Sequence, residues 1–377
     1  MTPIDRRTFI KTASSGAVAL GMTGLSGANL SAKSPVILGN NSVVKNNLPR
    51  WRGFNILQFF RPSFYDGFFP WPYEAVEQDF KWIADWGFDF VRLPISYRYY
   101  VNYNSYGAEP ITPEETVSFN EDAIETIEQV VYLAHKYKLH VSINLHRAPG
   151  YCIINEGIKE PFDLWADVEA QQAFCLHWEM WAKRFKNVST ELLSFNLVNE
   201  PLTDKADTYR KVTIDCLEAI RRHNPKRMVI ADGLNFDVAP NLEDLDLHQG
   251  CRGYNPGKIS HFRNPWSGDI NDSILPVWKK EDRKMLEEYY RPWIELKNRG
   301  IGVHCGECGS YNKTPHDVFI AWITDVLDIL TTNDIGWALW NFRGSFGVLD
   351  SGRKDVAYEN WYGHKIDRKL LDLLQNH

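Results

Sequence analysis

Beyond residue 48 the chain repeats one pattern, in which a short apolar segment of strand length is usually followed by a longer segment with helical spacing. No linker, low-complexity tract or clear internal repeat interrupts this alternation. The eight apolar segments cover residues 51–57, 88–96, 140–146, 192–200, 228–233, 251–256, 302–309 and 336–342. Eight strands that alternate with helices in one uninterrupted domain predict an α/β fold, the (β/α)8 TIM barrel.

Most of the segments between these strands place apolar residues three or four positions apart, as helices packed on a sheet do. The clearest example runs through Ile124, Ile127 and Val131, with Asn120 as its cap. Similar stripes begin at Val76, Phe174, Tyr209 and Val318. We interpret the stripes as helix-to-core packing and assign them no chemistry.

Two of the predicted strands carry a glutamate at their carboxyl ends. The segment 192–200 is apolar or amide-bearing until Glu200, and Pro201 prevents the strand from continuing. The segment 302–309 likewise brings Glu307 to its end, among glycines that allow close approach. A carboxylate at the end of a buried strand is costly without a partner or a chemical role, and a salt-bridged glutamate is the structural alternative.

Glu200 ends the fourth predicted strand and Glu307 the seventh. In a barrel these strands lie on opposite sides of the mouth, where the carboxyl ends of the strands carry the chemistry. Glycoside hydrolysis needs such a pair of facing carboxylates. One protonates the leaving oxygen, while the other attacks the anomeric carbon or activates water.

Six short motifs in chain order make the chain resemble glycoside hydrolase family 5, the cellulase family, from about residue 51 to residue 361. They are Arg-Gly-Phe-Asn at Arg52–Asn55, Val-Arg-Leu-Pro-Ile at 91–95, Leu-His-Arg-Ala-Pro-Gly at 145–150, Asn-Glu-Pro at 199–201, Gly-Glu-Cys-Gly at 306–309 and Trp-Asn-Phe-Arg-Gly-Ser-Phe-Gly at 340–347. Within the family, the segments 145–150 and 340–347 are more similar to clostridial endoglucanase C and the yeast exo-β-1,3-glucanases than to the mannanases.

The resemblance implies a role for each matching position. Glu200 corresponds to the general acid/base of a retaining mechanism, which requires a pKa raised toward about 6. Glu307 corresponds to the nucleophile and must stay ionised. No metal or cofactor takes part in this chemistry.

Four further matches are expected to bind the substrate or support the glutamates. Arg92 corresponds to the arginine that hydrogen-bonds the nucleophile, and Asn199 to the asparagine that holds the 2-hydroxyl of the sugar. His146 and Trp340 correspond to residues that line the sugar ring at the cleavage point. Taken singly, Arg92 could be a buried ion-pair partner, and His146 and Trp340 core residues. At strand ends together, they favour the functional interpretation.

One motif departs from the family, which usually carries His-x-Tyr at the end of the sixth strand. Here Arg252 replaces the histidine, while Tyr254 is kept and can hydrogen-bond the nucleophile. An arginine directed at Glu200 would lower the pKa of that carboxyl, which opposes acid catalysis near neutral pH. His248 and His261 are the two candidates to replace the missing histidine.

Aromatic residues are dense in the predicted loops at the barrel mouth. They are Phe59, Phe60, Phe64, Tyr65, Phe68, Phe69, Trp71 and Tyr73 after the first strand, and Trp266, Trp278, Phe346 and Trp361 after the sixth and eighth. Such rings either form the wall of a glycan cleft or pack as a lid on the barrel. Long loops after the first, third, sixth and eighth strands predict a partly blocked groove that favours chain ends or short oligosaccharides.

Cysteine usage and net charge exclude several other functions. Cys305 and Cys308 form a Cys-x-x-Cys, but no second pair lies at metal-binding spacing, so we expect neither a metal nor a redox role. The net charge of −6 supplies no basic field for a nucleic acid or an anionic membrane. An uncharged β-glucan is compatible with this net charge as the substrate. We expect the mature protein to act as a monomer.

The first residues predict an export signal that is separate from the fold. Arg6 and Arg7 precede a mildly apolar run at 17–28, the layout of a twin-arginine signal, although a disordered basic tail is the alternative. We therefore divide the chain into a signal segment, 1–32, and a hydrolase domain, 33–377, located in the periplasm or outside the cell.

The sequence thus predicts a retaining β-glycoside hydrolase that cleaves β-linked glucan by double displacement. Two alternatives stay open. The same residues could act on mannan or another hemicellulose. The chain could instead be a non-catalytic carbohydrate-binding barrel, which Arg252 makes conceivable and the intact glutamate pair disfavours.

Overall fold

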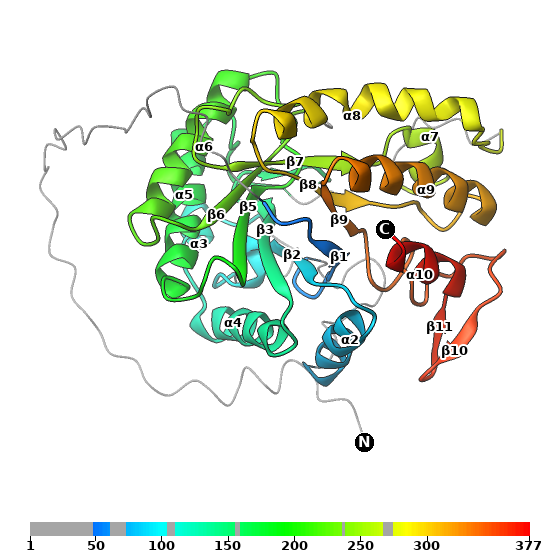
Figure 1. Cartoon of the computed structure of the whole chain (residues 1–377). Helices are drawn as coiled ribbons and strands as arrows, with labels where there is room; N and C mark the ends of the chain where they lie inside the picture. The colour runs from blue at the N-terminus through cyan, green and yellow to red at the C-terminus, as the bar shows by residue number, and fades with distance from the viewer. Residues whose placement is uncertain (1–47, 61–72, 104–109, 155–158, 236–237, 267–273) are drawn as a thin grey trace, which may run out of the picture. The chain divides into compact units, whose positions relative to one another are not determined.

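Eight parallel strands form a closed ring in the computed structural model, which describes residues 48–60, 73–103, 110–154, 159–235, 238–266 and 274–377 (Figure 1). In ring order the strands are β1 (Arg52–Asn55), β2 (Phe90–Ser96), β3 (His140–Ala148), β5 (Leu193–Val198), β6 (Met228–Asp232), β7 (His248–Gly253), β8 (Val303–Cys308) and β9 (Gly336–Leu339). The ring closes because β1 pairs in parallel with both β2 and β9. The predicted (β/α)8 barrel is confirmed.

The helices lie around the outside of the ring (Figure 1). The longer ones are α2 (Tyr73–Asp85), α4 (Glu121–Lys136), α5 (Val168–Arg184), α6 (Ala206–Arg221), α8 (Arg283–Asn298) and α9 (His316–Thr332), and α10 (Arg368–Gln375) ends the chain. Short elements in the connections are η1 (Tyr97–Tyr99), α3 (Pro113–Thr116), β4 (Tyr151–Cys152), α7 (Gly257–Ser260), η2 (Lys280–Asp282), β10 (Glu359–Trp361) and β11 (His364–Ile366). None of the helices in the described ranges is both long and apolar enough to cross a membrane.

The predicted helical stripes are the buried faces of these helices. In α4, Ile124, Ile127 and Val131 are buried, and the Asn120 side chain accepts a hydrogen bond from the Ala123 amide at 3.0 Å. That bond satisfies one of the free amides of the first turn. The stripes that begin at Val76, Phe174, Tyr209 and Val318 correspond to α2, α5, α6 and α9.

Three details of the barrel differ from the prediction. The sixth strand, β7, starts at His248 rather than at residue 251, because polar and small residues occupy its buried first half. The helix α8 was not predicted, since Pro292 and many charged residues interrupt its apolar pattern. The described part of the link between β6 and β7 contains no helix, so the alternation is incomplete there.

Aromatic side chains close the amino-terminal end of the barrel. The Trp51 and His140 rings stack with centroids 3.7 Å apart, and the Phe90 and His304 rings lie 4.7 Å apart. Trp51 precedes β1, while Phe90 and His140 are the first residues of their strands. With this end filled, the cavity described below lies at the carboxyl ends of the strands.

Some sequence predictions fall outside the described residues. The signal segment, 1–32, is among them, and so are Phe64, Tyr65, Phe68, Phe69 and Trp71. The division of the chain at residue 32 therefore stays a prediction.

Candidate active site

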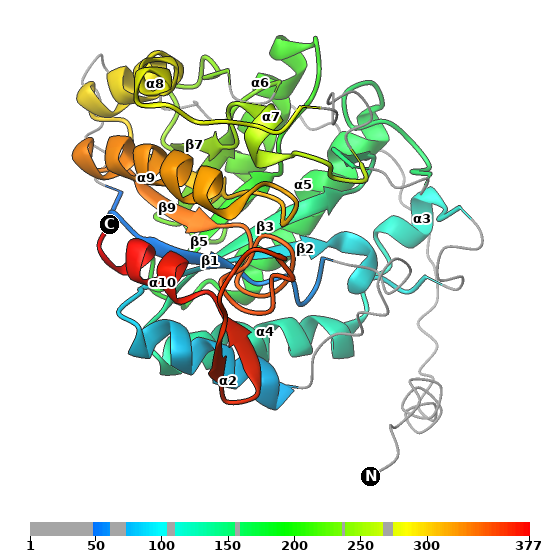
Figure 2. The ribbon, with the colours of Figure 1, turned by 90° about the vertical axis from the view of Figure 1, so that its right-hand side faces the viewer.

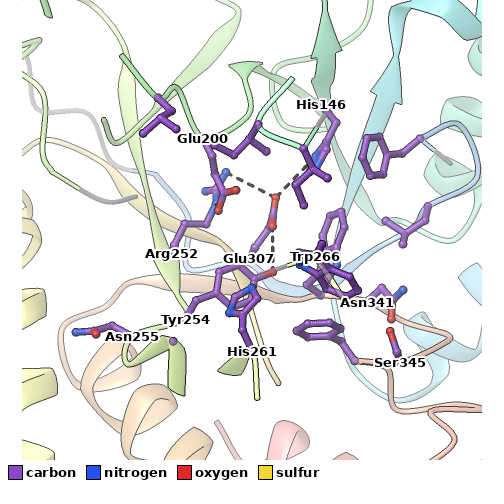
Figure 3. A pocket seen from close by; sticks show the side chains of 18 of the residues that line it. His146, Glu200, Arg252, Tyr254, Asn255, His261, Trp266, Glu307, Asn341 and Ser345 are labelled. Carbon is purple, nitrogen blue, oxygen red and sulfur yellow. Dashed lines mark hydrogen bonds and ion pairs between the residues drawn. The ribbon is translucent and has the colours of Figure 1, made fainter. Parts of the chain in front are cut away.

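Both predicted glutamates line one cavity of about 600 Å³ at the carboxyl ends of the barrel strands (Figure 3). Figure 3 shows the side chains of Glu200, Arg252 and His146 directed toward Glu307. Arg252 joins the two carboxylates, with its Nε 3.1 Å from Glu200 Oε1 and its Nη2 3.7 Å from Glu307 Oε1. The predicted juxtaposition of the two glutamates is therefore present.

Glu307 lies within β8 and is held by two donors, one on β2 and one directly after β7. Arg92 Nη1 donates to Oε1 at 2.6 Å, and the Tyr254 hydroxyl donates to Oε2 at 3.0 Å. Burial and the Glu307 charge raise the pKa of Tyr254 well above its ordinary value, so its hydroxyl stays a donor. Both oxygens of the Glu307 carboxyl are thus held by hydrogen bonds.

Glu200 follows the end of β5, and its backbone adopts a left-handed conformation with φ of +42°. This conformation is uncommon outside glycine and needs support from its surroundings. The Glu200 amide donates to Asp232 Oδ2 at 3.1 Å, and the Glu200 carbonyl accepts from the Tyr151 hydroxyl at 2.6 Å. Contacts from two neighbouring strands therefore fix the residue at the cavity edge.

The pKa of Glu200 is raised to about 7, chiefly by burial and next by the negative charge of Glu307. Arg252 acts in the opposite direction, as the sequence analysis expected of an arginine pointed at this carboxyl. Burial and the Glu307 charge outweigh it. The two glutamates therefore have different surroundings although they share one cavity.

Arg92 lies beneath the cavity, where its guanidinium connects four strands. Its Nε donates to Asn196 Oδ1 at 2.9 Å, its Nη1 to Asn55 Oδ1 at 3.0 Å, and its Nη2 to Asn199 Oδ1 at 2.7 Å. The predicted contact of Arg92 with Glu307 is present. Arg92 is fully buried and is not among the residues that line the cavity, so it supports the nucleophile candidate from behind.

Asn199 also lies behind the cavity wall and is 0% exposed. Its Oδ1 accepts from both Arg92 and Arg252, while its Nδ2 lies 3.4 Å from Glu200 Oε2 and 3.3 Å from His146 Nε2. The amide thus connects two arginines with the Glu200 carboxyl. Its contact with a sugar hydroxyl stays a prediction.

His146 and Trp340 line the cavity side by side, with their rings stacked 5.0 Å apart. The Phe60 ring packs on His146, with the two ring centroids 3.9 Å apart. Burial, Arg92 and Arg252 lower the pKa of His146 well below its ordinary value, so the ring is neutral. These residues provide a flat, uncharged wall next to the glutamates.

Of the other sequence candidates, only some reach the cavity. Among the two histidines, His261 lines it, whereas His248 is the first residue of β7 and lies at the opposite end of the barrel. Trp266 and Phe346 line the cavity. Trp278 instead donates from its indole to Asp325, and Trp361 packs on Trp82 and Trp86.

The sequence analysis missed Asp232, Asn55 and Asn196. Asp232 is the last residue of β6 and contacts Arg252, Asn196 and the Glu200 amide. A buried carboxylate at the end of a predicted strand was a usable signal, since the same reasoning identified Glu200 and Glu307. Asn55 and Asn196 lie within apolar strands, and only the fold brings them to Arg92.

The thiols of Cys305 and Cys308 are buried in the sheet and bond to its backbone. Cys305 Sγ donates to the Glu307 carbonyl and Cys308 Sγ to the Ala338 carbonyl, each at 3.4 Å. Within the described ranges, no group of three or more His, Cys, Asp or Glu side chains is arranged to hold a metal ion.

A closed parallel barrel that carries two glutamates on one cavity, at the ends of its fourth and seventh strands, defines a barrel-type glycosidase. More narrowly, the chain belongs to the cellulase family, glycosyl hydrolase family 5, whose sequence profile matches residues 45–345.

Known proteins of similar sequence and structure agree with this assignment. Endoglucanase C from Acetivibrio thermocellus is 26% identical over 347 residues, which cover 83% of this chain and 95% of that protein. Cellodextrinase A from Ruminococcus flavefaciens is 28% identical over 275 residues, 69% of this chain and 76% of that protein. A crystal structure of a glycoside hydrolase superposes with a TM-score of 0.77 at 34% identity and covers 87% of this chain and 99% of its own.

Proposed function

We propose that this chain hydrolyses β-linked glucan or gluco-oligosaccharides with retention of configuration, with Glu307 as nucleophile and Glu200 as acid/base. The observation that carries the proposal is the contrast between the two carboxyls. Glu200 has a pKa raised to about 7, whereas Glu307 accepts hydrogen bonds from Arg92 and Tyr254. Environments that separate the protonation of two facing carboxyls are the mark of this mechanism.

In the first step, Glu307 Oε attacks the anomeric carbon while Glu200 gives its proton to the leaving glycosidic oxygen. The ester formed at Glu307 carries no negative charge. Because that charge helps to raise the pKa of Glu200, its loss leaves Arg252 to favour the Glu200 carboxylate. In the second step this carboxylate takes a proton from water, which attacks the anomeric carbon and releases the sugar and Glu307.

Three features support a glucan substrate. Relatives with significant similarity include proteins called endoglucanase C and cellodextrinase A. The rings of Trp266, Phe346 and Trp340 line the cavity and offer flat faces for sugar rings. Asn341 Oδ1 is buried at the cavity wall without a hydrogen-bond partner in the part of the chain that the structure describes, so a sugar hydroxyl can fill this position.

The decisive experiment follows the anomeric configuration of the product. With an aryl β-cellobioside, proton NMR should show the β-anomer first. Glu307→Ala should abolish turnover, and azide should restore part of it as the α-glycosyl azide, since azide then attacks the substrate directly. Glu200→Ala with azide should give the β-azide, because azide then attacks the glycosyl-enzyme.

A panel of polysaccharides separates the remaining alternatives. Barley glucan, laminarin, carboxymethylcellulose, xyloglucan and mannan should be compared for release of reducing sugar and for product length. We expect turnover of glucans and a preference for short chains or chain ends. Saturable binding without reducing sugar would identify a carbohydrate-binding protein, and turnover of mannan alone would reject the glucan assignment.

We also propose export through the twin-arginine route and action as a monomer outside the cytoplasm. The support for export is Arg6 and Arg7 ahead of the apolar run 17–28. Replacing both arginines with lysine should retain the activity in the cytoplasmic fraction. Light scattering of the purified protein tests the monomer.

A further inference from the structure

We propose that Asp232 is a positioning residue for Glu200, which holds the Glu200 backbone and neutralises Arg252 so that Glu200 can carry a proton beside a guanidinium. This inference rests on the proposed function. It concerns a residue outside the matching motifs and a contact that arises from Arg252, where the family usually has histidine.

Asp232 is 2% exposed and uses both carboxylate oxygens. Oδ2 accepts from Arg252 Nη2 and from the Glu200 amide at 3.1 Å, and Oδ1 accepts from Asn196 Nδ2 at 2.8 Å. One oxygen thus joins the arginine to the backbone of the acid/base candidate. Arg252 in turn places its Nε 3.1 Å from Glu200 Oε1.

The neighbouring strand leaves room for this carboxylate. Gly250 of β7 lies beside Asp232, and a Cβ on Gly250 would come within 2.5 Å of Asp232 Oδ1. A side chain at residue 250 would therefore displace the carboxylate from Arg252. The absence of a side chain at Gly250 therefore leaves room for the Asp232 carboxylate to pair with Arg252.

Asp232 is one of four charged side chains that face Glu200. Two guanidinium groups approach Glu200, Arg252 from β7 and Arg92 from β2, and Glu307 from β8 opposes them. Asp232 from β6 supplies the second negative charge. Three further neighbours add no charge, namely the Tyr254 hydroxyl after β7, the neutral ring of His146 on β3 and the Tyr151 hydroxyl on β4.

Removal of the Asp232 charge leaves an excess positive charge next to Glu200, which favours the carboxylate over the acid. Removal of the Arg252 charge has the opposite effect, since the guanidinium stabilises the carboxylate. The two substitutions should therefore shift the protonation of Glu200 in opposite directions. A loss of packing or stability alone would not produce such a pair of shifts.

The test compares the pH dependence of kcat/KM on an aryl β-cellobioside for the wild type, Asp232→Asn and Arg252→Gln. The alkaline limb of this profile is the pH range in which kcat/KM falls as Glu200 loses its proton. It should move to lower pH by about one unit in Asp232→Asn and to higher pH in Arg252→Gln. At a pH on the wild-type limb, Asp232→Asn should lose roughly tenfold through this shift alone. The position of the limb is compared rather than the height, because both variants also lose contacts.

Asp367→Asn is the matched control, because Asp367 is also a buried carboxylate, 2.8 Å from His316 Nε2, and does not line the cavity. This variant should unfold at a lower temperature, and the alkaline limb of its kcat/KM profile should stay at the wild-type pH. Limbs that coincide with the wild type, or that move in the same direction in both active-site variants, would overturn the proposal. If Asp232→Asn does not fold, an unmoved limb in Arg252→Gln overturns it. A wild type without turnover would reject the proposed function instead.

Discussion

Glu200 and Glu307 carry the same side chain, and their surroundings alone give them different chemistry. Arg92 and Tyr254 donate to Glu307, whereas Glu200 is largely buried beside the Glu307 charge, and Arg252 and Arg92 favour its ionised form. The motifs identified the two glutamates, but only the fold shows which neighbours surround each carboxyl.

The pH dependence of kcat/KM should report the Glu200 carboxyl. Its pKa is raised to about 7, and the first step requires the protonated form, so activity is full below that pH and falls as the pH rises through it. The expected alkaline limb therefore has an apparent pKa of about 7. In Glu200→Ala, assayed on an aryl glycoside whose leaving group needs no proton, this limb should disappear. A limb that persists in the variant would assign it to another group.

Tyr254→Phe should lower kcat/KM by roughly tenfold to a hundredfold, because a hydrogen bond to a charged group is lost at Glu307. Tyr311→Phe is the control, since Tyr311 packs on Trp266 and Phe346 rather than on the glutamates. Steady-state kinetics of both variants decide the matter. Equal effects of the two substitutions would show that Tyr254 acts through packing only.

At the scale of the elements, the sequence predicted those helices whose apolar residues recur at helical spacing. The helix α4 combines a buried stripe with the Asn120 cap, whereas α8 carries Pro292 in its interior and was missed. The strand β7 was misplaced because His248 and Gln249 are polar although buried. Asp232 could have been identified as a carboxylate at a strand end, but its contacts with Arg252 and Glu200 join three different strands and needed the fold.

The Asn120 cap offers a direct test of the local reasoning. Asn120→Ala should lower the free energy of unfolding by about 1 kcal/mol, because the Ala123 amide loses its acceptor. Asn120→Asp keeps an acceptor and should retain most of the stability. Urea denaturation followed by circular dichroism measures both. An unchanged midpoint in Asn120→Ala would mean that the cap contributes nothing in this barrel.

At the scale of the whole molecule, a closed barrel must pair its first strand with its last, and we call this pairing of β1 with β9 the seam. The last residues of the chain add contacts next to the seam. Figures 1 and 2 both show α10 beside β1 and α9. The Gln375 carbonyl accepts from Arg52, the first residue of β1, at 3.3 Å. The terminal His377 reaches Asp328 of α9, with its Nε2 3.0 Å from the carboxylate. Sequence patterns could not show these contacts of Gln375 and His377, because they link segments that are far apart in the sequence.

The contribution of α10 can be measured separately from catalysis, because its contacts lie near the start of β1, whereas the cavity lies at the other ends of the strands. Leu374 is fully buried in α10, so Leu374→Ala should lower the free energy of unfolding by about 2–5 kcal/mol through lost burial and the cavity left behind. Asp372→Ala, at an exposed position of the same helix, should change it little. Both variants should keep the wild-type kcat below their melting temperatures. A fall in kcat of the folded Leu374→Ala protein would show instead that the seam and the active site are coupled through the barrel.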